Sequence, residues 1–558
     1  MNQSSVHSTA VGLNDGAPID FEPRDRDDDQ GVPPSAQSQV LDNPDLLEVI
    51  LASFHVPQAG PDTPSRIPFP DSQHLVWASL TARPFFDPAM TILWRSMDSW
   101  LPLLQLIPVL RKEGGVYNMH GVVHRQDLQR LDVYGRHIRR LDLRSMHQAV
   151  SPYIYTYILR HQPCLFPALR ELVIPNIERI GLENLPGLFL TVAASLSELS
   201  LGGIGPSTES VAGSLLQSVC IEAKSLRRLV LTGRFTTSSL SNVNQFTNLE
   251  ALEIHSCGAN LPQETLKTFS ELVSLKSLKI SLDDALISDP LSTSLSFEAL
   301  HNLEISASAV GVHAILRRVT VHHLTTIRIH LTSLGPGKPQ ESPTQCIQAI
   351  GLMTRATKSL KTINITSEAG SVRIPAAELT HLKAWTKVAH IDMVVGEVLP
   401  EVLNRLLSTG SWKSIQTLIL RSGLAPGQEG GVSTTSIFGW LQSLVFLPNV
   451  KHLTTSVAFS LNQPEVDTWR SAVQGPPVCH NLQDLVFLPL ESRPKLNCPD
   501  QTVENAFIFA QGINHYCPHL RNFDLSRMAG TYVNSDWGKG VELMVIGLQK
   551  ATSNVHVC

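Results

Sequence analysis

The side chains in this sequence with the widest chemical use are its 21 histidines. A neutral imidazole can accept a proton or bind a metal ion near physiological pH. His322 and His323 are adjacent, and four more lie near the starts of a repeat described below: His381, His452, His480 and His519. No histidine belongs to an HExxH sequence or to another set at metal-ligand spacing, so we expect no metal site and no catalytic histidine.

Three other stretches resemble catalytic or nucleotide-binding loops only superficially. The glycine-rich segments Leu334–Pro339 and Gly427–Ser433 lack the Lys-Ser or Lys-Thr pair that follows the glycines of a phosphate-binding loop. The paired carboxylates Asp283 and Asp284 lie between two repeats, where a solvated turn accounts for them. No GxSxG sequence precedes a triad in recognisable order. We therefore expect no catalytic residue, no cofactor and a protein that is not an enzyme.

The eight cysteines are scattered along the chain. They form neither a CxxC pair nor a Cys/His series at zinc-ligand spacing, a pattern typical of reduced, structural thiols in an intracellular protein. Cys558 is the last residue rather than the fourth from the end, so it forms no prenylation box. The cysteines thus predict no zinc site and no lipid anchor.

Composition argues against several classes of partner. The chain has 558 residues, of which 42% are hydrophobic, enough for several domains or for one long array. A net charge of −5 and the lack of a basic block argue against nucleic acid. The N-terminal residues show no secretory signal, and the most apolar stretch, Trp100–Leu110, is too short to cross a bilayer. We expect no membrane partner and a location in the cytoplasm or the nucleus.

An internal repeat accounts for most of the chain. Its form is aliphatic-x-x-aliphatic-x-aliphatic, and fourteen copies begin at Ile138, Leu169, Leu196, Leu226, Leu249, Leu275, Leu300, Leu324, Leu360, Val388, Ile415, Val450, Leu482 and Leu520. The last two aliphatic residues of a copy are two positions apart, so they point to the same side of a short strand. A single strand cannot bury that side, whereas stacked copies form a parallel sheet with one continuous core.

The segments between the copies predict the second layer of this fold. Four of them have the length and composition of helices: Glu209–Ala223, Gln263–Leu272, Pro400–Leu407 and Val503–Tyr516. We therefore expect residues 138–558 to form a leucine-rich-repeat solenoid of the α/β class, with a curved parallel sheet, outer helices and a C-terminal cap at residues 538–551. A connecting helix is expected before it, at residues 113–137. The copy at Val450 has Thr455 in place of its third aliphatic residue, so we expect a local distortion of the sheet there.

Composition changes sharply well before the first repeat. Residues 1–39 are rich in Asp, Ser, Gln, Gly and Pro, and they are expected to form a disordered acidic tail. From Val40 to Phe54 apolar residues recur at helical spacing, with Asn43 as a cap and Pro44 in the first turn, which predicts a helix. Five prolines then fall within residues 55–72, which predicts a surface loop.

Further helices are expected after this loop. Residues 72–80 and 87–95 have the residue types and spacing of helices, and Pro88 suits the first position of the latter. A fourth apolar segment, Leu101–Leu110, is expected to pack beside these helices and to lead into the repeats. The sequence therefore predicts a small helical segment, all of it N-terminal to the solenoid.

Together these parts resemble the F-box-like leucine-rich-repeat proteins that are abundant in mushroom-forming fungi. The resemblance rests on Pro44–Leu51 in the first helix, on the turn Phe85–Ala89 and on Ile92–Trp94 at the end of the third. It covers most of residues 40–112, and the repeat array in outline. It implies a non-catalytic receptor, in which the F-box helices bind the adaptor of an SCF-type ubiquitin ligase and, through it, a cullin. The repeats then hold the protein substrate.

The resemblance also implies which side chains contact the adaptor. They are the apolar residues of the first helix and the tryptophan that ends the third: Pro44, Leu46, Leu47, Ile50, Leu51 and Trp94. The first helix supports part of this set by itself, because it carries more apolar residues than a three-helix unit needs for its own packing. The alternative, in which all of them are internal core, stays open at this point.

The repeats predict where a protein substrate binds. Residues that alternate with the buried aliphatic residues point to the opposite side of each strand, the concave face that solenoids commonly use for binding. The charged members are Arg140, Asp142, Glu171, Glu198, Arg228, Glu253, Lys279, Glu304, Arg328, Asp392, Asp484 and Asp524. Because eight are acidic and four are basic, the sequence predicts a mildly acidic face that favours a basic protein partner. Solvated charges of mixed sign are the alternative.

Two functions fit these observations. The first is the substrate-recognition subunit of an SCF-type ubiquitin ligase, with an unidentified protein substrate. The second is a leucine-rich-repeat scaffold for protein interaction with no link to a ubiquitin ligase. They differ in whether the apolar residues of 44–54 present an exposed face to a partner.

Overall fold

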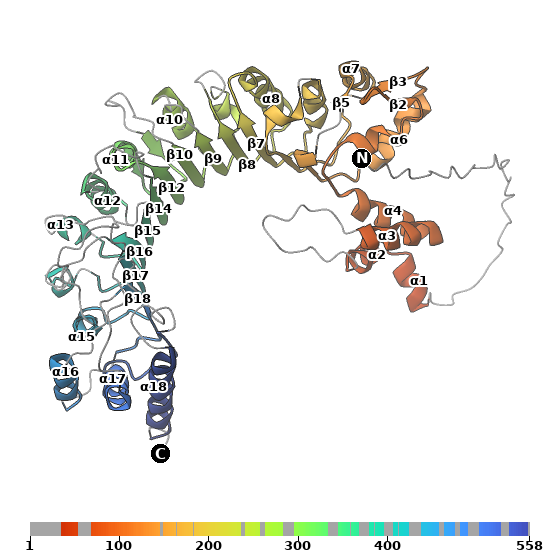
Figure 1. The fold of residues 1–558 in the computed structure, drawn as a ribbon. Coiled ribbons are helices and arrows are strands. Elements are labelled where there is room, and N and C mark those ends of the chain that lie inside the picture. The colour runs from red at the N-terminus through yellow and green to blue at the C-terminus, as the bar shows by residue number, and fades with distance from the viewer. Residues whose placement is uncertain are drawn as a thin grey trace, which may run out of the picture. The chain divides into compact units, whose positions relative to one another are not determined.

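The structure is a computed structural model, and the residues that it describes are 35–53, 69–145, 149–162, 164–181, 183–235, 240, 242–256, 263–282, 295–332, 344–357, 359–367, 379–383, 385–395, 405–410, 412–422, 437–456, 463–474, 480–488, 502–525 and 535–555. They divide into two compact units: a helical unit that ends at residue 92, and a repeat unit that begins at residue 93. Figure 1 draws both. Most of the expected acidic tail lies outside the described residues, but residues 36–41 are helical rather than part of a tail.

The described part of the helical unit contains four helices, the last of which runs two residues into the repeat unit. They are α1 (Ala36–Leu41), α2 (Pro44–Ala52), α3 (Phe69–Thr81) and α4 (Arg83–Trp94). Asn43 caps α2 as expected, because its side-chain oxygen accepts hydrogen bonds from the backbone N–H groups of Asp45 and Leu46, both at 3.1 Å. The small core of this unit contains Leu47, Leu51, Leu75, Ala89, Met90 and Ile92.

The start of α4 differs from the expectation. The helix begins at Arg83, a turn earlier than predicted, and Pro88 lies buried inside it rather than in its first position. Pro84 is the proline that occupies the first turn, where the missing N–H has no helical partner to lose. Pro88 instead leaves the carbonyl of Pro84 without its usual helical hydrogen bond, a pattern that spacing alone does not reveal.

The repeat unit is organised by one parallel sheet of fifteen strands within the described residues. In order across the sheet they are β1 (Ser96–Met97), β4 (Arg140–Asp142), β6 (Glu171–Ile174), β7 (Glu198–Ile204), β8 (Arg228–Gly233), β9 (Ala251–Ser256), β10 (Ser277–Leu282), β12 (Asn302–Ala307), β14 (Thr326–Leu331), β15 (Thr362–Ser367), β16 (His390–Val395), β17 (Thr417–Ser422), β18 (His452–Ser456), β19 (Asp484–Leu488) and β20 (Asn522–Asp524). Fourteen of them coincide with the fourteen sequence copies, which confirms the predicted solenoid. β1 was not predicted, because it has two residues and no aliphatic pattern.

The strands stack in register, so equivalent residues of successive copies lie side by side. Leu252 of β9 pairs with Leu278 of β10, and Leu278 pairs with Leu303 of β12. All three are almost fully buried, and they belong to a core that runs along the whole array. Burial of these aliphatic columns is the main favourable contribution to folding, at about 1.5–3 kcal/mol for each fully buried side chain.

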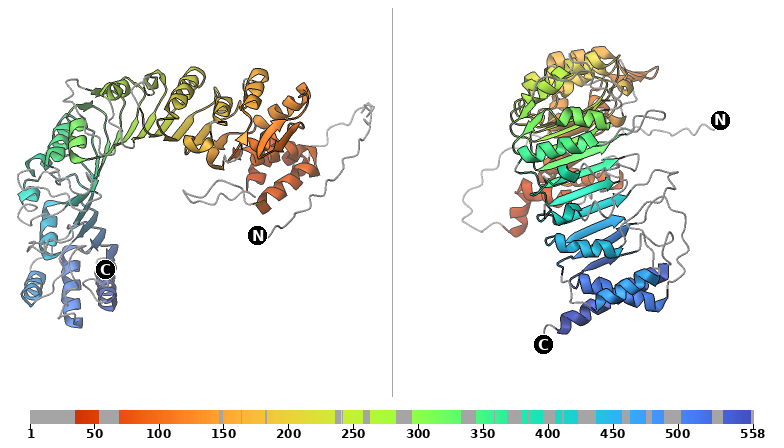
Figure 2. Two further views of the ribbon diagram at one scale, coloured as in Figure 1. Left: turned by 45° about the horizontal axis from the view of Figure 1, so that its top comes forward. Right: turned by 90° about the vertical axis from the view of Figure 1, so that its left-hand side faces the viewer.

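Helices form the second layer of the repeat unit. They are α7 (Pro152–His161), α8 (Glu209–Glu222), α10 (Gln263–Ser270), α11 (Ala309–Leu316), α12 (Thr344–Ala356), α13 (Leu379–Leu382), α15 (Ile437–Ser443), α16 (Gln463–Val473), α17 (Val503–Tyr516) and α18 (Ser535–Val555). Short 3-10 turns replace a helix in some copies: η1 (Leu143–Ser145), η2 (Ile177–Ile180), η3 (Leu185–Thr191), η4 (Val243–Gln245) and η6 (Leu444–Phe446). Figures 1 and 2 show the helices along the convex side of the repeat unit and the strands along its concave side.

Three of the four predicted intervening helices are confirmed as α8, α10 and α17. Of the fourth, only residues 405–407 are described, and they are helical. The segment predicted as a C-terminal cap, residues 538–551, lies within α18. A separate pair of parallel strands, β11 (Leu295–Phe297) and β13 (Val319–Val321), lies outside the main sheet. None of the described helices is both long and apolar enough to span a membrane.

The N-terminal end of the repeat unit differs from the prediction. The segment at Leu101–Leu110 belongs to the repeat unit, where α5 (Leu101–Leu104) buries Leu103 and Leu104 in its core. The expected helix at residues 113–137 is present only as α6 (Arg125–Gly135). Before it, β2 (Leu110–Glu113) and β3 (Val116–Met119) form a hairpin that also pairs with β5 (Ala149–Val150). Gly114 and Gly115, with φ of 56° and 90°, make its two-residue turn.

The sheet is regular at the copy where a distortion was expected. Thr455 of β18 is fully buried and pairs in register with Leu420 of β17 and Phe487 of β19. The irregularity lies instead between β7 and β8, at the register shift between Leu201 and Ile204. Threonine is β-branched like valine and isoleucine, so it fits the same strand geometry. A threonine in place of the third aliphatic residue therefore leaves the backbone regular.

Replacing Thr455 with valine is expected to stabilise the repeat unit by about 1 kcal/mol. The Thr455 hydroxyl donates a single long hydrogen bond of 3.5 Å to the carbonyl of Ser456, so its burial is poorly compensated. Chemical denaturation monitored by circular dichroism measures the change. Thr454→Val, on the half-buried outward side of the same strand, is the control and should change stability little. A destabilised Thr455→Val variant would show that the hydroxyl supports the strand.

Candidate functional site

Histidines and carboxylates form no metal cluster in the part of the chain that the structure describes. His323 stacks against His301 with ring centroids 6.3 Å apart, and His480 is buried with its Nε2 atom 2.7 Å from the carbonyl oxygen of Leu447. Burial lowers the pKa of His480, which favours a neutral ring. These contacts account for His301, His323 and His480 as parts of the repeat packing.

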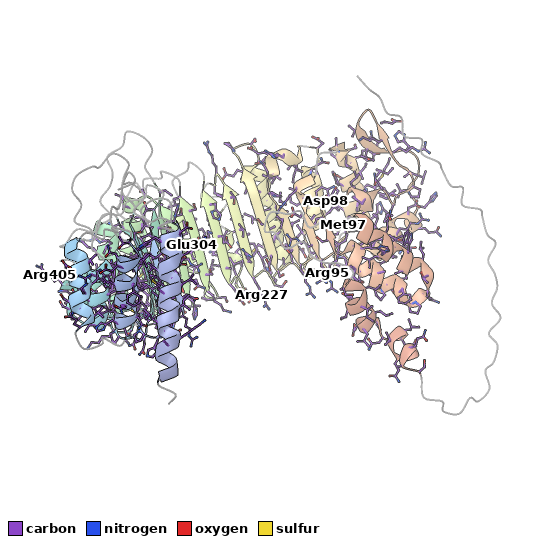
Figure 3. All side chains as sticks on the ribbon, turned by 60° about the horizontal axis from the view of Figure 1, so that its bottom comes forward. Arg95, Met97, Asp98, Arg227, Glu304 and Arg405 are labelled. Atoms are coloured by element: carbon purple, nitrogen blue, oxygen red, sulfur yellow. The ribbon has the colours of Figure 1, made fainter. Side chains whose placement is uncertain are left out.

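The concave sheet face carries rows of side chains that the strand register brings together. Glu253, Lys279, Glu304 and Arg328 are register partners on four successive strands, β9, β10, β12 and β14. Their charges alternate in sign along the row. Figure 3 labels Glu304, which lies within this row. Cross-strand neighbours of opposite charge attract each other, so the row is neutralised from within.

Ion pairs along this face confirm that the charges are matched. The nearest pairs are Arg228 with Glu253 at 2.7 Å, Lys279 with Glu304 at 2.8 Å, and Arg421 with Asp392 at 3.0 Å. Glu304 also lies 3.7 Å from Arg328, and His452 contacts Asp484. A hydrogen bond with His255, together with the nearby Arg228 guanidinium, lowers the pKa of Glu253 to about 2, so this carboxylate stays ionised at neutral pH.

The first strands of the face show the same matching. Arg140 lies 3.2 Å from Glu171 and 3.8 Å from Asp142, and Arg144 lies 3.1 Å from Asp142. Burial raises the pKa values of Asp142 and Glu171, against the effect of the arginines. Asp142 is almost fully buried, so it does not present its carboxylate to a partner, although the sequence placed it on the binding face.

The structure therefore does not support an open acidic face. Arginines form ion pairs with most of the carboxylates that made the predicted face acidic. Sequence reasoning missed Arg421 because it follows the last aliphatic residue of its copy. Sequence reasoning also missed four histidines that continue the outward alternation: His255, His330, His390 and His452. Hydroxyl and amide side chains fill much of the remaining face: Ser281, Asn302, Ser306, Thr326, Thr362, Asn364, Thr366, Thr417 and Thr454.

The helical unit presents an apolar face on α2. Leu46 and Ile50 are each 45% exposed and Val49 is 69% exposed, whereas Leu47 and Leu51 are buried. The first three lie at positions i, i+3 and i+4, so they form one stripe on the helix surface. Of the residues predicted to contact an adaptor, Pro44, Leu46 and Ile50 are therefore exposed. Leu47 and Leu51, which were also predicted to contact the adaptor, are instead core residues of the helical unit.

Two further features of helices α3 and α4 were not expected. On α3, Val76, Trp77 and Leu80 are all exposed, the tryptophan to 58%. Trp94, predicted to contact an adaptor, is half-buried and packs in the repeat unit, where its ring centroid lies 4.8 Å from that of Tyr134. Trp94 is therefore accounted for by packing, while α3 adds a second apolar surface to the helical unit.

Comparison with known proteins adds little to these observations. No protein-family model matches the chain, and no curated protein matches it in sequence. Among solved structures, the chain is similar to Rad7, from the crystal structure of the yeast Rad7 and Elc1 complex, with 14% identity, a TM-score of 0.29, and coverage of 65% of this chain and 88% of that one.

A second solved structure is the leucine-rich-repeat ectodomain of the Arabidopsis receptor kinase HAESA, crystallised with a peptide hormone. The identity is 12%, the TM-score is 0.22, and the match covers 71% of this chain and 63% of the other. Neither match supports a functional conclusion, because both TM-scores are below 0.5. The strand order and register seen here define the repeat unit by themselves as a leucine-rich-repeat solenoid of the α/β class.

Proposed function

We propose that this protein is a non-catalytic substrate receptor of an SCF-type ubiquitin ligase. The helical unit binds the adaptor, which joins the receptor to a cullin, and the concave sheet face binds the protein that is ubiquitylated. The observation that carries the proposal is the exposed stripe of Leu46, Val49 and Ile50 on α2. It lies within the segment that resembles an F-box, on the helix for which an adaptor contact is expected.

The stripe is not part of the core of its own unit. Leu47 and Leu51 turn inward from the same helix and fill the core with residues from α3 and α4. Helix α2 therefore has apolar residues on two faces, and only one of them is covered within the unit. Exposed apolar clusters of this kind mark interfaces, since leaving them in water forfeits the free energy of their burial.

The composition of the concave face suits recognition of a protein surface. Its charges are already paired, so they contribute orientation and specificity more than net attraction. The hydroxyl and amide groups between them offer hydrogen bonds along the array, as solenoid binding faces commonly do. We therefore expect binding of the substrate to depend only weakly on salt, in contrast to the strong dependence that an acidic face would give.

Replacing Leu46 and Ile50 together with alanine is expected to weaken adaptor binding at least about thirtyfold, because truncated apolar anchors cost on the order of 1–2 kcal/mol each. The measurement is titration of the full chain with a purified SCF adaptor protein, followed by calorimetry or biolayer interferometry. Ile221→Ala with Val273→Ala, which truncates two exposed residues of the repeat unit, is the matched control. It should bind as the unmodified chain does.

Two results would contradict the proposal. A folded Leu46→Ala, Ile50→Ala variant with unchanged affinity would show that α2 is not the contact surface. A failure of the unmodified chain to bind the adaptor would exclude the ligase and favour a leucine-rich-repeat scaffold that binds proteins without it.

A further inference from the structure

Helix α18 closes the repeat unit beyond β20 (Figures 1 and 2). The end elements of a solenoid normally present a polar outer face, which keeps the array soluble. The inner face of α18 is well buried through Val541, Val545 and Gln549. Its outer face departs from the rule, because Leu543 is 70% exposed and Ile546 is 38% exposed.

Two glycines on the same outer face are not explained by the packing of this chain. A Cβ atom added to Gly540 or to Gly547 would meet nothing within 4 Å. Glycine in a helix interior weakens the helix relative to alanine, so an unconstrained pair on one helix needs another cause. Glycine is used where a second backbone or bulky side chain approaches a helix closely.

The outer face of α18 is complementary to itself. With 3.6 residues per turn, one side of the helix, within about 60° of Leu543, presents Asp536, Lys539, Gly540, Leu543, Ile546, Gly547 and Lys550. If a second α18 lies antiparallel with the two Leu543 residues in contact, positions equally far before and after Leu543 come to the same height along the pair. Because the two-fold axis keeps each residue on its own side of the pair, Gly540 then faces Gly547 of the other copy, and Asp536 faces Lys550.

The antiparallel pairing suits both the contacts at the centre of the helix and the charged contacts at its ends. The facing glycines let the two helix backbones approach closely, and the opposite charges meet at both ends of the apolar centre. By two-fold symmetry each contact occurs twice. A parallel arrangement in register would instead place Lys550 against Lys550 and Asp536 against Asp536, so the charges select the antiparallel one.

We propose that the outer face of α18 is a dimer interface, on which a second copy of this chain packs antiparallel about Leu543. The occupant is a second copy because the complementary groups all lie on this one helix. One helix face is smaller than a standard protein interface, so the expected dissociation constant is on the order of 10 µM. Such a dimer presents two concave faces and two helical units, and it is independent of the function proposed above.

The first test is sedimentation equilibrium of the full chain over a concentration series. The unmodified chain should pass from monomer to dimer, and Leu543→Asp should weaken the dimer at least a hundredfold. Leu352→Asp, at a 56% exposed position of α12, is the matched control and should dimerise normally. A chain that stays monomeric, or a dimer unaffected by Leu543→Asp, would overturn the proposal.

The second test examines the antiparallel register by exchange of charges. Asp536→Lys alone and Lys550→Asp alone each place like charges against each other twice, and each should weaken self-association about tenfold. A mixture of the two variants pairs opposite charges at both ends, so it should form a heterodimer as tightly as the unmodified chain. Failure of the mixture to recover would exclude this arrangement of the helices.

Discussion

A Leu252→Asp variant is expected to lose more than about 4 kcal/mol of unfolding free energy. Leu252 has 0% exposure and lies in register between Leu229 of β8 and Leu278 of β10. A carboxylate there has no cation within the aliphatic column and no route to water, so it must be buried unpaired or be protonated at a cost. Denaturation by urea, followed by circular dichroism, measures the loss.

The control is Ala251→Asp, one residue away on the half-buried outward side of β9. It adds the same carboxylate to the same strand, and it should cost less than about 1 kcal/mol. Because each copy contacts only its neighbours, damage from Leu252→Asp should spread outward from β9, and limited proteolysis should first cut the copies around it. Equal stability of the two variants would show that the column is not the tightly packed core described above.

An Asn184→Leu variant is expected to lose about 3 kcal/mol of unfolding free energy. Its side-chain oxygen accepts hydrogen bonds from the Tyr155 hydroxyl at 2.7 Å and from the backbone N–H of Val150 at 3.2 Å. Its amide nitrogen donates to the carbonyl of Ile180 at 2.9 Å, and the Tyr155 oxygen accepts from the Trp100 indole at 3.1 Å. Leucine removes the centre of this network and leaves several polar groups without partners.

All of these groups lie at the N-terminal end of the repeat unit, away from water. Burial raises the pKa of Tyr155 well above its usual range, so the phenol remains a donor at neutral and moderately alkaline pH. Asn481→Leu, at an exposed position, is the control and should change thermal stability by no more than a degree or two, consistent with about 0.5 kcal/mol. Tyr155→Phe should lie between the two variants. An Asn184→Leu variant as stable as the control would mean that water or rearranged side chains satisfy the network.

The sheet could be predicted from sequence because each copy contains the full pattern of aliphatic residues that specifies one strand. Leu249, Leu252 and Ile254 are spaced to enter one core from one short strand, and this spacing is the same wherever the strand lies. Helices α8 and α17 were predicted for the same reason, since their lengths and apolar positions can be read from the local sequence. Pro88 and residues 113–124 were predicted wrongly, since their local composition fits more than one structure and their long-range packing decides between them.

The sites depended on contacts that no local pattern contains. The spacing of Leu46, Leu47, Ile50 and Leu51 established a helix with two apolar faces, but which face is buried follows from α3 and α4, which pack against one of them. On the concave face, Arg228 and Glu253 are 25 residues apart and become partners only because β8 and β9 stack. The sequence alone determined the repeat, the strands and the charged residues; tertiary structure decided which side chains meet, because register sets the distances over which charges and apolar surfaces interact.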